Sequence, residues 1–458
     1  MLIPVSRDTY RRAAAVGLIL VLLGGGPLAG TVNASQNNPS VPGEAPPAPP
    51  VGELVARALA NAPSIAARRA RLEAAQAALE SADVLPDPSV EFEFRDGGFP
   101  RLTLGSDVMS MVGATVRQPI LTPGRRSARR AEAVAEVDQR HAETDATACD
   151  LTAAVRLRYG RLYAIDRERA IVRDAEEMAR LLAETASARY SAGESDQTTV
   201  LRAQLERTRL GERAVDLDTE RLVVVATLNR LLDQPPATPL GEVRELPEAL
   251  PLPGAFTALP DLAASVAPDV SVRKAEVAAA SMRVDLARQE LRPSYTLGGA
   301  FYWQGGTDRI AAVSVGVEWP LRKNQKQRPA IAASERELEA ARYDLQDTAA
   351  QTRADATRLI AEIRRAEEQI VRYRQGLLPQ SSAALDSARA SYLGGRGDFA
   401  SVLDEFRRWT EIHIELAQRE ASRFAAWGQL DVLVNPAQHG DWSHPREQGT
   451  DARKEPRS

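Results

Sequence analysis

The sequence is poor in several features that define common protein classes. Of its 458 residues only 5% are aromatic, and Cys149 is the single cysteine. Few aromatic residues argue against an ordinary compact enzyme core, because Phe, Tyr and Trp supply much of the buried area of such cores. A single cysteine excludes an intrachain disulfide and a cysteine-based zinc cluster. With 58 basic and 62 acidic residues, the chain also lacks the basic surplus typical of nucleic-acid binding.

Patterns that carry chemistry are missing too. The sequence contains no nucleophile elbow, phosphate loop or dinucleotide fingerprint. Two thioethers, Met109 and Met111, are of the kind that copper prefers, but we interpret them as packing residues. The four histidines have no spacing typical of a metal site: His141, His413, His439 and His444. We therefore predict no enzyme activity, no cofactor and no resident metal.

No apolar run reaches the roughly 18 to 20 residues of a membrane-spanning helix. The longest run, residues 13–23, follows Arg7, Arg11 and Arg12 and precedes Val32-Asn33-Ala34. Basic residues, an apolar stretch and small residues in this order are typical of a secretory signal peptide. We expect removal of residues 1–34, with a retained N-terminal helix as the alternative. Residues 35–51 are Pro-rich and predict an extended leader.

After the leader the sequence repeats itself with a period near 200 residues. Ala62-Pro63-Ser64-Ile65 returns as Ala267-Pro268-Asp269-Val270, and Gln118-Pro119-Ile120 returns as Trp319-Pro320-Leu321. The segment from Tyr190 through Gly193 and Asp196 to Val200-Leu201 returns from Tyr392 through Gly395 and Asp398 to Val402-Leu403. We predict repeat 1 over residues 52–235, a linker over 236–259, repeat 2 over 260–434 and a mobile polar tail over 435–458.

Each repeat shows the same order of periodicities. A helical segment (residues 52–83 and 260–290) leads to two short alternating segments. A long helix (125–190 and 327–393), a glycine turn and a shorter helix (196–233 and 398–434) follow. At 1.5 Å per residue the long helix spans about 100 Å, too long for a compact domain. Its apolar stripe is wide enough to contact a neighbour on each side, which favours a ring of helices. Pro379, near Gly376, should kink or interrupt the second long helix.

The alternating segments predict four strands with two different faces. In the first, Val90, Phe92 and Phe94 alternate with Glu91 and Glu93. Strands of about ten residues can cross a bilayer, although a half-buried soluble hairpin fits the pattern as well. Lipid does not tolerate open sheet edges, so four strands could span it only together with copies from other subunits. Three subunits would supply twelve strands, within the range of outer-membrane barrels.

These motifs resemble the TolC-like family of outer-membrane efflux proteins. The resemblance covers residues 52–434 and is carried by the duplication, by Arg117-Gln118-Pro119-Ile120 with Pro123-Gly124-Arg125-Arg126, and by Leu378-Pro379-Gln380. It implies a mainly α protein with a small membrane β-barrel: a homotrimer whose twelve-stranded barrel lies in the outer membrane of a Gram-negative bacterium and continues into a periplasmic helical tube. It also implies a periplasmic adaptor (membrane fusion) protein and an inner-membrane pump, often of the resistance-nodulation-division type, as partners.

In that picture the helix-to-helix turns are periplasmic tips that contact the adaptor. The predicted tip residues are Tyr190, Gly193, Asp196, Val200, Leu201, Tyr392, Gly395, Asp398, Val402 and Leu403. Gly193 and Gly395 suit turns that need a left-handed backbone. We expect Asp196 and Asp398 to cap helices rather than to gate a pore. Trp303 and Trp319 are candidates for an interfacial aromatic girdle. The cargo stays open between metal ions and drugs, and a type I secretion duct or a periplasmic coiled-coil scaffold are alternative functions.

Overall fold

The computed structural model describes residues 46–96, 104, 106, 107, 109–248, 252–304 and 309–439, all within one unit, Ala45–Ser458. The predicted signal peptide, most of the predicted leader and the tail beyond residue 439 lie outside the described residues.

The first helical segment of each repeat is two helices rather than the single one predicted. Repeat 1 has α1 (Val51–Asn61) and α2 (Pro63–Ser81), and repeat 2 has α5 (Leu259–Val266) and α6 (Pro268–Gln289). The breaks fall at Ala62 and Ala267, whose ψ angles are 126° and 149°. A residue that precedes proline is disfavoured in the helical region, while proline itself is well suited to the first turn of the next helix. The duplicated Ala-Pro pair is therefore the signal for this break.

The predicted long helices are present. Repeat 1 contains α3 (Pro123–Ser191), whose 69 residues correspond to about 100 Å. In repeat 2 the helix is interrupted, as predicted: α7 (Gln327–Arg372) passes through a π-helical turn, η1 (Tyr373–Leu377), into α8 (Leu378–Leu393). The turn ends two residues before Pro379, which has no N–H to donate to the i−4 carbonyl. The shorter helices are α4 (Gln197–Leu231) and α9 (Phe399–Val434).

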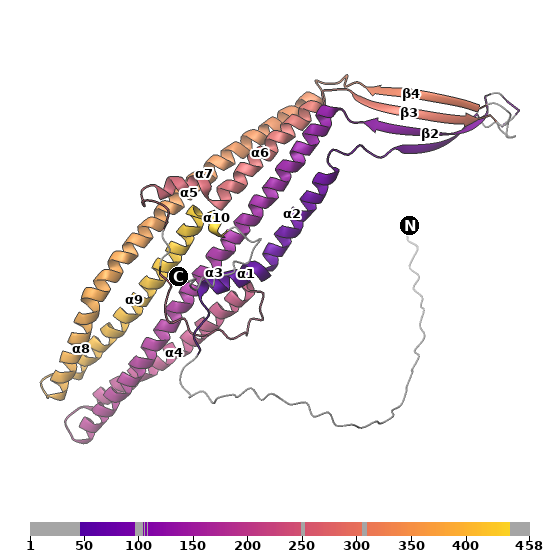
Figure 1. The fold of residues 1–458 in the computed structure, drawn as a ribbon. Coiled ribbons are helices and arrows are strands. Elements are labelled where there is room, and N and C mark those ends of the chain that lie inside the picture. Colours follow the sequence, from indigo (N-terminus) through magenta and orange to yellow (C-terminus); the bar gives the residue numbers. More distant parts are fainter. Residues whose placement is uncertain are drawn as a thin grey trace, which may run out of the picture. The chain divides into compact units, whose positions relative to one another are not determined.

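Helix α3 packs against α2, α4, α6 and α9, and α7 packs against α5, α6 and α9, so the long helices have neighbours on more than one side (Figure 1). Three main apolar clusters lie along them, and many of their members are small. Ala58, Ala148, Ala175, Ala263 and Ala356 are fully buried. Close packing of small side chains between helices accounts for the low aromatic content, because no thick core has to be filled.

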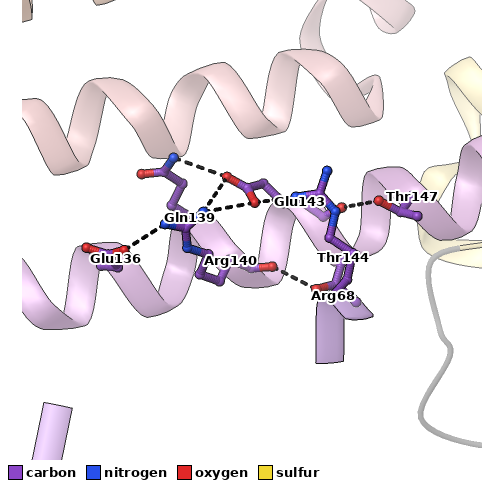
Figure 2. Close-up of polar contacts among 7 residues, drawn as sticks. All are labelled: Arg68, Glu136, Gln139, Arg140, Glu143, Thr144 and Thr147. Atoms are coloured by element: carbon purple, nitrogen blue, oxygen red, sulfur yellow. Dashed lines mark hydrogen bonds and ion pairs between the residues drawn. The ribbon is translucent and has the colours of Figure 1, made fainter. Parts of the chain in front are cut away.

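Each Ala-Pro break is followed by two basic residues, Arg68-Arg69 in repeat 1 and Arg273-Lys274 in repeat 2. The first arginine of this pair has different partners in the two repeats. In repeat 1, Arg68 of α2 reaches across to α3, where its Nη1 donates to Glu143 Oε2 at 2.6 Å (Figure 2). Gln139 and Arg140 of α3 also donate to this carboxylate, at 3.2 and 3.3 Å. In repeat 2, Arg273 instead pairs with Glu276 within α6 at 2.7 Å. The duplication therefore preserves the residue type but not the interhelical contact.

The inter-repeat linker is held by a buried carboxylate. Asp166 of α3 is 5% exposed and accepts from Arg221 Nε at 2.6 Å and from the Val243 backbone N–H at 2.9 Å. Arg221 also donates to the carbonyls of Leu240 and Gly241 at 2.9 Å. The last residues of the leader pair with the same segment, since the Ala48 N–H donates to the Glu242 carbonyl.

A buried carboxylate also anchors the end of α9. The structure there corrects the predicted start of the C-terminal tail. Residues 435–439 were predicted to belong to a mobile tail, but they carry the short helix α10 (Pro436–His439). Asp431, 1% exposed, accepts from Arg156 at 2.7 Å, Asn435 at 2.8 Å and His439 at 2.7 Å. Burial alone would raise the pKa of Asp431, but these hydrogen bonds outweigh it and lower the pKa from 3.8 to about 2.

The four predicted strands form one antiparallel sheet of order β1-β2-β3-β4. Their bounds are β1 (Ser89–Arg95), β2 (Met111–Ile120), β3 (Ser294–Trp303) and β4 (Arg309–Glu318). β1, with seven residues, is shorter than the ten expected. The pairing of β2 with β3 joins the two repeats. β1 and β3 follow the C-terminal ends of α2 and α6, and β2 and β4 lead into the N-terminal ends of α3 and α7 (Figure 1).

Within the described part of the chain, we find no helix whose length and apolar character would suffice to span a membrane.

Candidate functional site: the sheet and the helical tips

One face of the sheet is apolar across all four strands. The register aligns Val90, Val116, Gly299 and Val313 on this face, and the neighbouring row contains Phe92 and Phe301. These side chains are not covered by other described residues: Phe92 is 84% exposed and Val313 is 82% exposed. A contiguous exposed apolar surface of this kind marks contact with lipid or with another protein.

The opposite face is polar and carries hydrogen bonds between strands. Arg117 of β2 pairs with Glu91 of β1. The Tyr302 hydroxyl of β3 lies 3.4 Å from Thr115 Oγ1 and donates to Glu93 Oε2 at 3.4 Å. The alternation predicted from the sequence is therefore confirmed as two chemically different faces of one sheet.

Both outer strands have a free edge. Among the described strands, β1 pairs only with β2 and β4 pairs only with β3. Unpaired N–H and C=O groups along such edges are available to a strand of another chain.

At the far ends of the helices, the two glycine turns adopt the predicted conformation. Gly193 follows α3 with φ of 75°, and Gly395 follows α8 with φ of 71°. After α3, the Gly193 N–H donates to the Tyr190 carbonyl and the next N–H donates to the Arg189 carbonyl. These two bonds form a Schellman motif, and the turn at Gly395 repeats it.

The capping prediction is confirmed at one aspartate and wrong at the other. Asp398 accepts from the Ser401 backbone N–H at 2.9 Å, and hydrogen bonding to Ser401 lowers the pKa of Asp398. Asp196 stands at the same position before α4, but its side chain makes no capping hydrogen bond. The bond that closes this first turn comes from the backbone, where the Thr199 N–H donates to the Asp196 carbonyl at 3.1 Å.

Equivalent tip residues have different surroundings in the two repeats. In repeat 1, Tyr190 is 48% exposed and Leu201 is 54% exposed. Their counterparts Tyr392 and Leu403 are each 6% exposed, and Val402 is fully buried. The predicted tip residues of repeat 2 therefore include three that form the core between the tips, while Tyr190 and Leu201 of repeat 1 are exposed. Leu393, just before the Gly395 turn, is also exposed in repeat 2, at 65%.

Two polar contacts join the helical pair α3/α4 to the pair α8/α9 near the tips. Arg189 of α3 donates to the Tyr392 carbonyl, and its guanidinium lies 4.7 Å from the centre of the Tyr392 ring. Glu206 of α4 accepts from Arg407 of α9, from Nη2 at 2.6 Å and from Nε at 3.0 Å. Sequence reasoning missed these contacts, because charged residues occur on almost every helical turn and their spacing does not tell which of them meet.

No cluster of three or more His, Cys, Asp or Glu side chains suited to a metal ion occurs among the described residues. Cys149 is buried, and burial raises the pKa of its thiol to about 12, so it is not a reactive thiolate at neutral pH. Met109 is 61% exposed, so the packing role predicted for it is wrong within this chain.

The sequence matches the model of the outer membrane efflux protein family in two segments, residues 54–233 and 259–435. The chain belongs to the outer membrane efflux protein family. The two matched segments coincide with the two repeats, and this TolC-like family consists of transport channels rather than enzymes. A comparison with curated proteins found no match.

Solved structures of outer-membrane proteins share the fold. The outer-membrane channel OprN superposes with a TM-score of 0.72 at 19% identity, over 86% of this chain and 90% of that one. VceC from Vibrio cholerae gives 0.70 at 16% identity, over 84% and 95%. The open state of the MtrE channel from Neisseria gonorrhoeae gives 0.69 at 16% identity, over 84% and 89%. At these identities the likeness establishes the fold, which is mostly helical with a four-stranded antiparallel sheet.

Proposed function

We propose that this efflux-family protein is the outer-membrane exit duct of a tripartite efflux system. Three copies assemble so that their sheets close into one twelve-stranded barrel in the outer membrane, and their helices form a tube in the periplasm. The duct is passive. It receives its cargo from an inner-membrane pump, of the resistance-nodulation-division type, through a periplasmic adaptor protein.

The observation that carries this proposal is the sheet. One of its faces is apolar and exposed, and its two edge strands pair with no further described strand. Neither feature suits a single copy in water. Closure with neighbouring copies would satisfy the edges, and lipid would cover the apolar face. The polar face, with Glu91, Arg117 and Tyr302, would then line the interior. A periplasmic scaffold has no need of such strands.

Cysteine pairs across the edges test the assembly. Each variant has two cysteines on the polar face. One replaces Glu91 of β1, and the other replaces Ala312, Ser314 or Gly316 of β4. We expect one of these variants to yield covalent trimers in the outer-membrane fraction under oxidising conditions. The matched controls combine the cysteine at position 91 with a cysteine in place of Val313 or Val315, whose side chains point to the opposite face. Recovery of the protein as a soluble periplasmic monomer would contradict the proposal.

We further propose that the adaptor contacts the exposed side of the tips, at Tyr190 and Leu201. These apolar side chains are half exposed beside the Gly193 turn. Tyr190→Glu and Leu201→Glu should abolish cross-linking to the adaptor while the trimer persists. Leu222→Glu is the control, since Leu222 is 68% exposed on the same face of α4, three heptads away. An equal loss of adaptor cross-linking in all three variants would argue against a tip-specific contact.

In the proposed system the pump selects the cargo, so the cargo is tested in cells. A strain without this protein should become sensitive either to metal ions or to drugs, and the wild-type gene should restore resistance. Loss of a secreted protein from the medium, with unchanged resistance, would favour a type I secretion duct instead.

A further inference from the structure

The apolar row of β4 continues beyond the end of the strand. Val313, Val315 and Val317 are 82%, 70% and 53% exposed on the apolar face. Trp319, 59% exposed, and Leu321, 86% exposed, extend the alternation into the segment that leads to α7. The apolar face therefore ends in a tryptophan and a leucine at the side of the sheet that adjoins the helices.

Four cations follow at once: Arg322, Lys323, Lys326 and Arg328. None of them forms an ion pair with a described residue. Lys323 Nζ lies 5.9 Å from the centre of the Trp319 ring, where a cation is attracted by the aromatic face. The acidic residue that ends β4, Glu318, lies on the polar face and accepts from Ser294 at 3.1 Å. Among the described residues, these four positive charges therefore have no acidic partner.

The equivalent junction of repeat 1 differs. There, Arg125 pairs with Glu290 at 3.1 Å and Arg130 lies 3.8 Å from Asp83. Arg126 donates to the Asp83 carbonyl at 2.8 Å. Basic residues thus follow the second strand of both hairpins, but in the described part of the chain they have acidic partners at the first junction and none at the second. The uncompensated charge of the second junction calls for an anion from outside the chain.

We propose that residues 319–328, the β4–α7 junction, bind the anionic headgroups of phospholipids in the leaflet that faces the periplasm. This inference rests on the proposed function, because the barrel sets the height of the membrane. Trp319 and Leu321 would lie at the boundary of the acyl chains, where tryptophan is enriched. The cations just beyond them would meet the phosphates, as juxtamembrane basic segments do. Three copies would bring these charges to one level, where they repel each other unless anions neutralise them.

The test uses the full-length trimer in nanodiscs made from phosphatidylethanolamine and phosphatidylglycerol in equal amounts. The junction variant is R322Q/K323Q/K326Q/R328Q. The control variant R71Q/R207Q/R342Q/R365Q removes the same charge from four exposed arginines on helices, none of which forms an ion pair with a described residue. Native mass spectrometry counts the lipids of each kind that remain on the trimer.

We expect the wild type to enrich phosphatidylglycerol over phosphatidylethanolamine. In the junction variant the ratio of bound phosphatidylglycerol to phosphatidylethanolamine should fall by at least about tenfold. Each cation near an anionic surface contributes about fivefold to the binding constant. The control should stay within about twofold of the wild type, and added salt should weaken the preference of the wild type. Equal enrichment in the wild type and the junction variant would overturn the inference, as would a junction variant that falls apart into monomers, because the segment would then join copies. Failure of the wild type itself to insert as a trimer would refute the proposed function instead.

Discussion

Replacing Glu206 by Gln should loosen the contact between α4 and α9 near the tips. Glu206 is 7% exposed and accepts two hydrogen bonds from Arg407, whose side chain is 42% exposed. Exposed ion pairs contribute about 0.2 to 1 kcal/mol, and breaking a buried pair costs about 3 to 5 kcal/mol. This pair is intermediate, so we expect a loss of about 1 to 2 kcal/mol in the local stability of the contact.

Amide hydrogen exchange measures this loss directly, because it reports the free energy of local opening. A loss of 1 to 2 kcal/mol corresponds to roughly fivefold to thirtyfold faster exchange in the tip-proximal turns of α4 and α9. Arg408→Gln is the control: Arg408 pairs with Glu405 within α9 at 2.9 Å and is 62% exposed. This control should change the amide exchange rate by less than about twofold.

The double variant Glu206→Gln/Arg407→Gln completes the test. If the two side chains act as a pair, the effects of the single variants are not additive, and the double variant loses little more than either one. Additive effects, or exchange in Glu206→Gln that equals the wild type, would refute the reasoning. In the proposed duct, a looser contact between the two helical pairs should also raise the conductance of the reconstituted channel.

Three further predictions follow from buried or strained positions. Because the pKa of Asp431 is about 2 against an ordinary 3.8, its stabilisation is present above pH 4 and lost as the pH falls towards 2. Over that range the wild type should lose about 2 kcal/mol more than Asp431→Asn, measured by unfolding of the helices, because the other carboxylates titrate in both proteins. Gly395→Ala should cost about 1 kcal/mol, because its φ is 71° and no atom lies within 4 Å of an added Cβ, so that only the backbone is strained. Gly193→Ala should lower the stability by a similar amount in thermal unfolding. Unchanged stability in both variants would contradict the left-handed turns. Asp166→Ala leaves Arg221 without its carboxylate and should cost about 3 to 5 kcal/mol, detected as faster proteolysis of the linker. An unchanged cleavage rate would show that the carboxylate does not hold the linker.

Much of the fold could be read from periodicity and from the repeat. The long helices, the four strands and the left-handed Gly193 turn depend on local rules, namely the spacing of apolar side chains and the backbone freedom of glycine. The break at Ala62 was missed although its signal, the Ala-Pro pair, was visible. The pair marks the end of a helix as well as the duplication, because a residue before proline is disfavoured in the helical region.

The sequence by itself determined the architecture of this protein: a duplicated chain with two long helical segments, two-faced strands and glycine turns. Local backbone preferences and side-chain periodicity are enough for these features. Only the tertiary structure decided how the repeats diverge. Tyr392 is buried while its counterpart Tyr190 is half exposed, and Arg68 crosses between helices while Arg273 does not. These outcomes depend on which helix lies beside which, because burial and ion pairing are set by neighbours that are distant in the chain.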